Sequence, residues 1–282
     1  MHIFYENEAL IAYLKSIKIS HSTIGFVPTM GALHQGHLSL MQKSLSENDC
    51  TVVSIFVNPT QFNNSEDLAK YPRTLEDDKK KMESLNSEII VFAPSVDDIY
   101  LGKPSSQFFD FDGLENQMEG KFRPGHFNGV GTIVKRLFEI VTPTNAYFGE
   151  KDFQQLQIVK KLVAKNNLKV AIQSCPVCRE PNNLAMSSRN ELLTSEEKQE
   201  ASLIYKTLVD AKEKFGTNSA ATVAKWVKKS FEENPHFTLD YFQIADEATL
   251  LPCLRKNKYK KYRVFIAVFV NKVRLIDTIS LN

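Results

Sequence analysis

Short apolar runs alternate with helical patterns through residues 1–177. The apolar runs are rich in β-branched residues and predict buried strands. We expect these strands at 22–27, 51–57, 88–93, 145–149 and 169–175, with Pro28 ending the first. Apolar residues at helical spacing predict helices from about His37, over 74–85, over 130–141 and after 149. Alternating strands and helices predict a parallel sheet with right-handed crossovers.

Past Arg179 the pattern changes to that of a smaller α+β unit. The predicted elements there are helices over 195–215 and 220–233, a strand over 238–245 and a final hairpin that turns at Asn271-Lys272. We therefore expect an α/β domain over 1–177 and a smaller α+β domain over 178–282 that forms a lid over the cleft.

The bulk composition argues against some classes of partner. The chain has 282 residues, 43% hydrophobic and 24% charged, as in an ordinary globular protein. With 35 Lys and Arg against 33 Asp and Glu, the net charge of +2 is too small to argue for nucleic acid. No apolar stretch approaches the roughly 18 residues of a membrane span, and the start lacks a signal-peptide pattern. We therefore expect a cytoplasmic protein that binds neither nucleic acid nor membrane.

The cysteines do not suggest a disulfide framework, because they are scattered through a long chain as Cys50, Cys175, Cys178 and Cys253. The segment CPVC continues into a turn-rich loop, whereas a redox pair would normally open a helix. A structural zinc site would need two more well-spaced ligands. We therefore expect no redox role and no metal ligands from the chain.

The segment FVPTMGALHQGHLSLM, residues 26–41, places a polar loop between a strand and a helix. Ligands bind at such strand ends in open α/β sheets, where free backbone N–H groups and the helix dipole favour an anion. His34 and His37 then become candidate ligand contacts. Alternatively, Gly31 and Gly36 only shape the turn and the histidines cap the helix, since the spacing matches neither a dinucleotide fingerprint nor a Walker loop.

Three further polar segments follow predicted strands, namely VNPTQFN (57–63), GEKDFQQ (149–155) and LAMSSRN (184–190). Lys151 and Arg189 bring positive charge, and Ser187 and Ser188 bring hydroxyl donors. Asp152 can cap the next helix or accept from a ribose hydroxyl. Each residue alone has a plainer interpretation, as a cap, a turn residue or a solvated lysine. Together at one sheet edge they suit a triphosphate.

Five segments also resemble the signature segments of the pantothenate synthetase (pantoate–β-alanine ligase) family: PTMGALHQGH, FVNPTQF, EGKFRPGHFNGV, GEKDFQQ and REPNNLAMSSRN. The resemblance runs from the first strand through Asn190. It implies a Rossmann-like nucleotidyltransferase domain, with HQGH as the family's HIGH-like motif and MSSR as its KMSKS-like loop. It further implies a homodimer that acts in pantothenate biosynthesis, in the coenzyme A pathway.

The resemblance assigns an ATP site to these residues: Met30, Gly31, Ala32, Leu33, His34, Gln35, Gly36, His37, Gly149, Glu150, Lys151, Asp152, Cys178, Met186, Ser187, Ser188 and Arg189. Catalysis would rest on four of them: His34, His37, Lys151 and Arg189. Both histidines and Lys151 would contact the phosphates, and His37 would be the proton donor. Asp152 would contact the ribose, and Cys178 would lie on the adenine side.

The resemblance also implies a site for the other two substrates. Gln61 and Gln155 would hold pantoate, with Gln61 near β-alanine as well, and Asn58 would order the Gln61 loop. Two positions depart from the family pattern. Cys178 replaces a frequent valine of similar size, and Asn182-Asn183 replaces a frequent Asp-Gly, although asparagine tolerates a left-handed backbone.

The implied reaction has two steps. The carboxylate of pantoate would attack the α-phosphorus of Mg-ATP, giving pantoyl adenylate and pyrophosphate, and β-alanine would then displace AMP. The phosphates would hold most of the Mg²⁺ coordination. Asp77 and Asp78 are either outer-sphere helpers or, as we expect, solvated helix residues.

Two other functions remain open from the residues. One is an adenylyltransferase of the phosphopantetheine or nicotinamide mononucleotide type, which shares the His-x-x-His loop. The other is an inactive nucleotide-binding or RNA-interaction module. The pair Gln61 and Gln155 favours a small polyol acid as substrate, and neither lysine nor histidine is lost from the loops.

Overall fold

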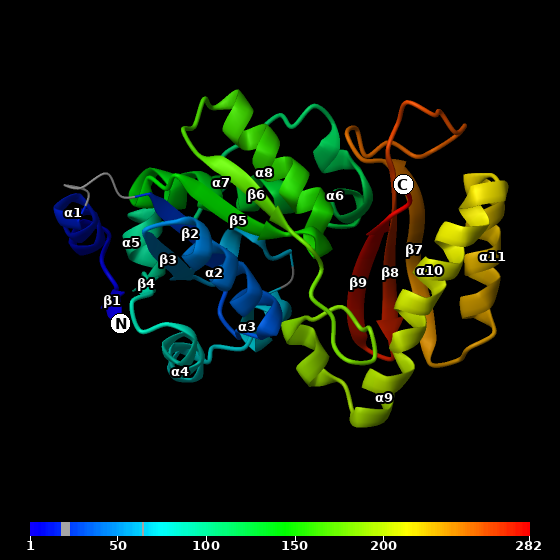
Figure 1. Cartoon of the computed structure of the whole chain (residues 1–282), viewed down its shortest axis with the longest axis horizontal. Coiled ribbons are helices and arrows are strands. Elements are labelled where there is room, and N and C mark those ends of the chain that lie inside the picture. The colour runs from blue at the N-terminus through cyan, green and yellow to red at the C-terminus, as the bar shows by residue number, and fades with distance from the viewer. Residues whose placement is uncertain (18–22, 64) are drawn as a thin grey trace. The chain divides into compact units, whose positions relative to one another are not determined.

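The structure is a computed structural model that describes residues 1–17, 23–63 and 65–282 (Figure 1). Ser22, the first residue of the first predicted strand, lies outside these ranges. The strands are β1 (His2–Phe4), β2 (Ile24–Thr29), β3 (Cys50–Ile55), β4 (Ile90–Phe92), β5 (Asn145–Gly149), β6 (Ala171–Cys175), β7 (Phe237–Asp246), β8 (Tyr262–Val270) and β9 (Val273–Ser280).

The α-helices are α1 (Asn7–Ile17), α2 (Gln35–Glu47), α3 (Ser65–Lys70), α4 (Leu75–Leu85), α5 (Val96–Tyr100), α6 (Met118–Phe122), α7 (His126–Val141), α8 (Phe153–Lys165), α9 (Ser195–Glu200), α10 (Ser202–Thr217) and α11 (Ala220–Glu232). The short 3-10 helices are η2 (Pro59–Gln61), η3 (Leu114–Asn116), η4 (Glu150–Asp152) and η5 (Ser188–Leu192). The described residues form two compact units, Met1–Gly149 with Gln155–Pro176, and Glu150–Gln154 with Val177–Asn282.

The first unit is built on a parallel sheet with the strand order β1-β4-β3-β2-β5-β6. This confirms the predicted α/β class. β1 and α1 were not predicted, and for β1 the reason is that three residues are too few to show an alternating pattern. The predicted start of α2 is two residues late, since the helix begins at Gln35.

The prediction that Pro28 ends the first strand is wrong. β2 continues to Thr29, and Pro28 lies opposite Ser54 in register with β3. Residues of β2 face β3 and β5 alternately: the carbonyl of Thr29 accepts from Phe56 beyond β3, whereas that of Ile24 accepts from Thr144 beside β5. Pro28 therefore faces β5, where pairing already ends at Phe26, so the ladder to β3 loses no donor.

Apolar side chains cover both faces of this sheet. On one face α2 and α4 pack against alternate strand residues in a cluster of Val27, Leu33, Leu40, Met41, Val53, Met82, Ile89, Val91, Tyr147 and Cys175. On the other face the ring of Phe138, from α7, makes T-shaped contacts with the rings of Phe26 and Phe148. Burial on both faces explains why the strands read as continuous apolar runs.

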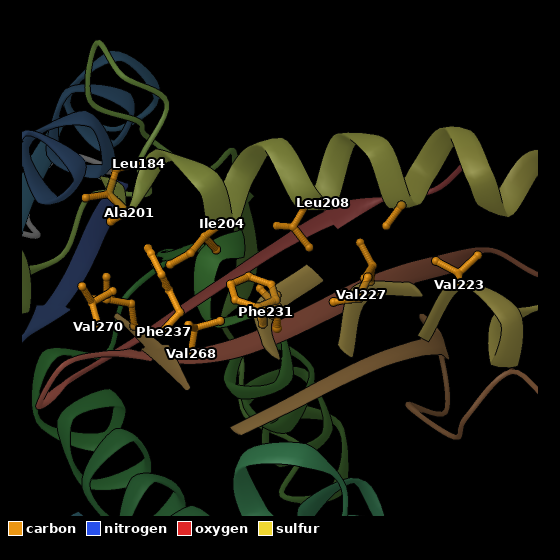
Figure 2. Close-up of a cluster of buried hydrophobic side chains, with 14 of the residues drawn as sticks. Leu184, Ala201, Ile204, Leu208, Val223, Val227, Phe231, Phe237, Val268 and Val270 are labelled. Atoms are coloured by element: carbon orange, nitrogen blue, oxygen red, sulfur yellow. The ribbon is translucent and has the colours of Figure 1, made fainter. Parts of the chain in front are cut away.

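The second unit contains the antiparallel sheet β7-β8-β9, which confirms the smaller α+β unit. The predicted hairpin is also confirmed, because Val270 pairs with Val273 and Asn271 takes a left-handed φ of 50° in the turn. Helices α10 and α11 pack on the sheet through Ile204, Leu208, Val223, Val227 and Phe231 (Figure 2). The single predicted helix over 195–215 is two helices, α9 and α10, separated at Ala201.

The strands of the first unit determine where the polar segments begin. β3, β2, β5 and β6 are neighbours in the sheet, and a polar segment follows the carboxyl end of each. In parallel α/β sheets this edge is where ligands bind. None of the described helices is long and apolar enough to cross a membrane.

Tyr147 generates a test of the first unit's core. Its side chain is buried, its hydroxyl donates to Glu47 Oε2 at 2.8 Å, and it accepts from Asn48 Nδ2 at 2.7 Å. Burial, with the hydrogen bond to Glu47, raises the pKa of Tyr147 to about 12. The neutral phenol then stabilises the fold fully below pH 10, and this contribution disappears as the pH rises through the folded pKa.

We expect wild-type protein to lose unfolding free energy more steeply between pH 10 and 12 than Tyr147→Phe, which has no phenol to ionise. At pH 8 we expect the wild type to be the more stable protein by about 1 kcal/mol, because the variant loses the hydroxyl's hydrogen bonds to Glu47 and Asn48. Denaturant unfolding of both proteins across this pH range measures the difference. Parallel curves would contradict the assignment.

Candidate active site

The loop after β2 ends in a helix cap made by two histidines. His34 is the N-cap of α2, and its Nδ1 accepts from the backbone N–H of Gly36 at 3.1 Å. In return, Nδ1 of His37 accepts from the backbone N–H of His34 at 3.3 Å. The two rings lie 4.1 Å apart between centroids. The interpretation that these histidines cap the helix is therefore correct, and their Nδ1 atoms make the cap.

This cap fixes the tautomer of both rings. A ring nitrogen that accepts a hydrogen bond carries no proton, so the proton of each neutral imidazole is on Nε2. Both Nε2 atoms are then donors at the amino end of a helix, where the dipole favours negative charge. Capping and anion binding are thus compatible uses of the same two side chains.

Asp78 holds the rest of this loop, which corrects the expectation that it is a solvated helix residue. Its carboxylate is fully buried, with Oδ2 accepting from the N–H of Ala32 at 2.9 Å and Oδ1 from that of Leu33 at 2.7 Å. Thr74 donates to Oδ2 as well, at 3.3 Å. Asp77, by contrast, is exposed and pairs with Lys80.

The loop needs such support because it turns through two left-handed residues. Gly31 has φ of 82° and Ala32 has φ of 50°, a conformation that is costly for alanine. A Cβ on Gly31 would lie 3.1 Å from Asp78 Oδ2, so glycine also admits the carboxylate. Gly36, which in the alternative interpretation only shapes the turn, lies in the first turn of α2.

Gln61 is held by a buried polar network at the end of η2. Asn58 Nδ2 donates to Gln61 Oε1 and to the carbonyl of Gly129, each at 3.2 Å. Tyr100 donates to Asn58 Oδ1 at 2.5 Å, and burial raises the pKa of this tyrosine. The Nε2 of Gln61 lies 3.1 Å from Met30 Sδ, which brings the η2 segment beside the loop after β2. Asn58 thus contacts Gln61 as expected.

The backbone of Gln61 is fixed by residues that the sequence analysis left without a role. Its carbonyl accepts from His126 Nδ1 at 2.8 Å and from Arg123 Nη2 at 3.3 Å. A Cβ on Gly129 would lie 2.4 Å from the carbonyl oxygen of Thr60, so only glycine lets α7 approach η2 this closely. All three residues lie in or beside the segment EGKFRPGHFNGV, and its resemblance to a family signature was the available signal.

In the second unit, η4 carries Glu150, Lys151 and Asp152. The Lys151 side chain is mostly buried, with Nζ 3.9 Å from Asp152 Oδ2, while Asp152 is about half exposed. Glu150 has a different environment, because its Oε2 accepts from Arg263 Nη2 at 3.0 Å. Gly149 closes β5 and Gln155 lies in α8, both in the first unit. Among the described residues, no hydrogen bond joins Gln155 to Gln61.

The segment 178–190 forms a short hairpin that leads into η5. Met186 donates its backbone N–H to Cys178 at 3.0 Å, and the sulfur atoms of these two residues lie 3.6 Å apart. Asn183 has φ of 69°, so the second asparagine of Asn182-Asn183 adopts the left-handed turn as expected. Ser187 then caps η5 by accepting from the N–H of Arg189 at 3.2 Å.

Arg179 fastens this hairpin to the rest of the second unit. Its guanidinium donates to both carboxylate oxygens of Asp277, at 2.7 and 2.9 Å, and lies 4.0 Å from the ring centroid of Tyr205. The four cysteines are free thiols. Within the described ranges, no group of three or more His, Cys, Asp or Glu side chains could hold a metal ion.

Taken unit by unit, the predicted residues are mostly hydrogen-bond donors. The first unit offers two imidazole N–H groups beside an amide, and the second offers an ammonium, a guanidinium and two hydroxyls. Such donors suit phosphate and carboxylate oxygens. The network around Gln61 suits a small polar substrate, because a buried amide that is held in place discriminates by hydrogen bonding.

Comparison with known proteins gives consistent relatives along the whole chain. The sequence model of the family described as pantoate-beta-alanine ligase matches residues 2–280. The pantothenate synthetase of Flavobacterium psychrophilum is 65% identical over 282 residues, which is 100% of both chains. That of Christiangramia forsetii is 52% identical with the same coverage.

Solved structures give the same relatives. Pantothenate synthetase from Thermus thermophilus has a TM-score of 0.89 and 37% identity, covering 100% of this chain and 99% of that one. Pantoate-beta-alanine ligase from Francisella tularensis, complexed with beta-gamma ATP and β-alanine, has a TM-score of 0.82 and 38% identity, with coverage of 100% and 98%.

The histidine cap predicts a difference between two substitutions of His34. Asparagine keeps an acceptor close to the position of Nδ1, whereas alanine removes it. We expect His34→Asn to keep the wild-type unfolding free energy within about 0.5 kcal/mol and His34→Ala to lose about 1 kcal/mol. Denaturant titration measures both. Equal losses would show that Nδ1 does not cap the helix.

The Asp78 carboxylate predicts a local and a global effect. Asp78→Asn keeps the shape but replaces one acceptor by an amide NH₂, which leaves one buried N–H of the loop unpaired. We expect a loss of about 1–3 kcal/mol in unfolding free energy and faster hydrogen exchange at Ala32 or Leu33. Asp77→Asn is the matched control, since exposed sites change stability by about 0.5 kcal/mol or less. Similar behaviour of the two variants would refute the role of Asp78.

Proposed function

Because the chain belongs to the pantoate–β-alanine ligase family, it is an ATP-dependent ligase that joins pantoate and β-alanine to pantothenate, and we propose that it does so through pantoyl adenylate. The full-length match decides against the adenylyltransferase alternative. The observation that carries the proposed chemistry is the histidine cap, because it makes both Nε2 atoms donors at one helix N-terminus.

The adenylate solves a chemical problem. A carboxylate is a poor electrophile, and its oxygen is a poor leaving group. In the first step a carboxylate oxygen of pantoate bonds to the α-phosphorus of ATP, and the bond from that phosphorus to pyrophosphate breaks. In the second step the amine of β-alanine attacks the acyl carbon, AMP leaves with the bridging oxygen, and the amine loses a proton to solvent. Positioning and charge stabilisation supply most of the catalysis.

We assign the donors as follows. His34 and His37 donate from Nε2 to the phosphates, and His37 is the proton donor of the pair. Lys151 and Arg189 balance the charge that shifts onto the leaving pyrophosphate. Asp152 accepts from the ribose, and the remaining contacts to ATP come from the segments Met30–His37, Gly149–Asp152 and Met186–Arg189, with Cys178 on the adenine side. Two observations support this assignment. The cap fixes the tautomers of His34 and His37, and the candidate residues of each unit are mainly hydrogen-bond donors.

Glu150 would contact ATP through its backbone, because its carboxylate accepts a hydrogen bond from Arg263. Pantoate is held by Gln61 and Gln155, with β-alanine also close to Gln61. The support is the rigid setting of Gln61, whose amide and carbonyl are both hydrogen-bonded by neighbours. The relative from Francisella tularensis, complexed with beta-gamma ATP and β-alanine, shows that a family member binds both kinds of molecule.

The remaining proposals concern the surroundings of the reaction. ATP is bound as its Mg²⁺ complex, since Mg²⁺ prefers phosphate oxygens and water to a dedicated protein cage. The enzyme acts in the cytoplasm as a homodimer. The unit formed mainly by Val177–Asn282 acts as a lid during the reaction, which would keep water from the adenylate.

A labelled-pyrophosphate experiment tests the adenylate. With pantoate and Mg-ATP but no β-alanine, we expect label to exchange into ATP, because the first step is reversible and needs no amine. Adding β-alanine then releases AMP and pantothenate. Lys151→Ala should slow the exchange by about 10²-fold, the scale of losing one preorganised donor. Exchange that requires β-alanine in the wild type would refute the two-step route while leaving the ligase activity in place.

A further inference from the structure

Arg263 is a buried cation with two acidic partners. It lies in β8 with 5% of its surface exposed. Its Nη2 donates to Glu150 Oε2 and its Nε to Glu247 Oε1, each at 3.0 Å. The guanidinium carbon lies 4.0 Å from the ring centroid of Phe153, and that ring also meets Phe265 at 6.0 Å. All of these residues belong to the second unit.

These contacts bracket the two residues between Glu150 and Phe153. Arg263 binds the carboxylate of the residue before Lys151 and the ring of the residue after Asp152. The η4 turn is therefore fastened at both ends to one rigid side chain on a central strand, as β8 lies between β7 and β9. Glu247, which follows β7, in turn fixes the guanidinium from its Nε side.

Stability alone is a poor reason for this arrangement. Removing a guanidinium and two carboxylates from water costs several kcal/mol per ion, and apolar residues of similar volume often stabilise a fold as well or better. The charged cluster instead fixes the orientation of its neighbours. A planar guanidinium holds its partners through hydrogen bonds in one plane, while its face stacks on a ring.

We propose that Arg263 is a positioning residue for Lys151, which sets the place of the lysine ammonium by clamping the turn on both sides. The proposal rests on the proposed function, in which Lys151 contacts the phosphates of ATP. It extends the machinery of the reaction into β8, a strand that carries none of the residues in the ATP or pantoate sets. A displacement of about 1 Å in a catalytic group can cost up to about 10²-fold in rate.

The decisive substitution is Arg263→Lys, which keeps the charge but loses the planar fork. We expect pantothenate formation to fall about tenfold in kcat, with less than about a threefold change in the KM for ATP, because Lys151 is misplaced mainly with respect to the transition state. The same factor should appear in pyrophosphate exchange. Arg274→Lys is the matched control, since Arg274 also forks onto a carboxylate, that of Asp240, with a tyrosine ring nearby. It should leave kcat within about twofold, the range of an independent site.

A double-mutant cycle separates positioning from mere folding. In a Lys151→Ala background, Arg263→Lys should change kcat by less than about twofold, because its effect passes through the lysine. It should lower the melting temperature equally in both backgrounds. If Arg263→Lys does not fold, Glu150→Gln releases the same end of the turn and takes its place in the cycle, with the same expected coupling to Lys151.

The outcomes distinguish the two proposals. Equal loss of kcat from Arg263→Lys in both backgrounds, or an equal loss in Arg274→Lys, would overturn the positioning role while Lys151 keeps its own. Full activity of Lys151→Ala would refute the assignment of Lys151 and the role of Arg263 with it. Ligation is measured directly, so absence of pyrophosphate exchange in the wild type would count only against the adenylate.

Discussion

The backbone N–H groups after β2 have to find acceptors, and the polar architecture of the first unit follows from how they do. A loop that leaves a strand and enters a helix has donors that neither ladder nor helix can satisfy. Asp78 accepts from two of them and the imidazole rings of His34 and His37 from two more. Because side chains already occupy these backbone groups, an anion bound at this helix would be held by ring N–H groups. This differs from phosphate loops in which the backbone itself forms the cradle.

In the second unit the antiparallel sheet carries charged anchors on both faces. Asp277 pairs with Ile266 in register, so it shares the face of the apolar cluster and receives Arg179 there. Arg263 is an odd number of positions away from Ile266 along β8 and therefore points to the other face, where it receives Glu150. One small sheet thus fastens the hairpin before η5 on one side and the η4 turn on the other.

Sequence patterns predicted the elements that have a regular spacing of apolar residues or a typical turn sequence. Long apolar periodicities identified α7 and five of the six parallel strands, and the final hairpin followed from its turn residues. The family signatures identified the polar segments. The behaviour of Asp78, Arg263 and Pro28 could not be obtained in this way, because each depends on contacts with residues far along the chain. Asp78 and Asp77 are adjacent acids in one helix, and only the position of the loop makes one buried and the other exposed.

Pro28 has a consequence for the carboxyl edge of the sheet. The strand order reverses between β2 and β5, since β3 and β4 continue on one side and β6 on the other. β2 pairs with β5 only at Gly25 and Phe26. The next residue of β2 that faces β5 is Pro28, which has no N–H to donate to another hydrogen bond of the ladder. Pro28 thus ends the hydrogen-bonded pairing of β2 with β5 before the carboxyl ends of these strands, while β2 stays paired with β3 through Thr29. Open α/β sheets receive their ligands at such a reversal, and here an imino acid inside a strand limits the pairing of the two strands on either side of it.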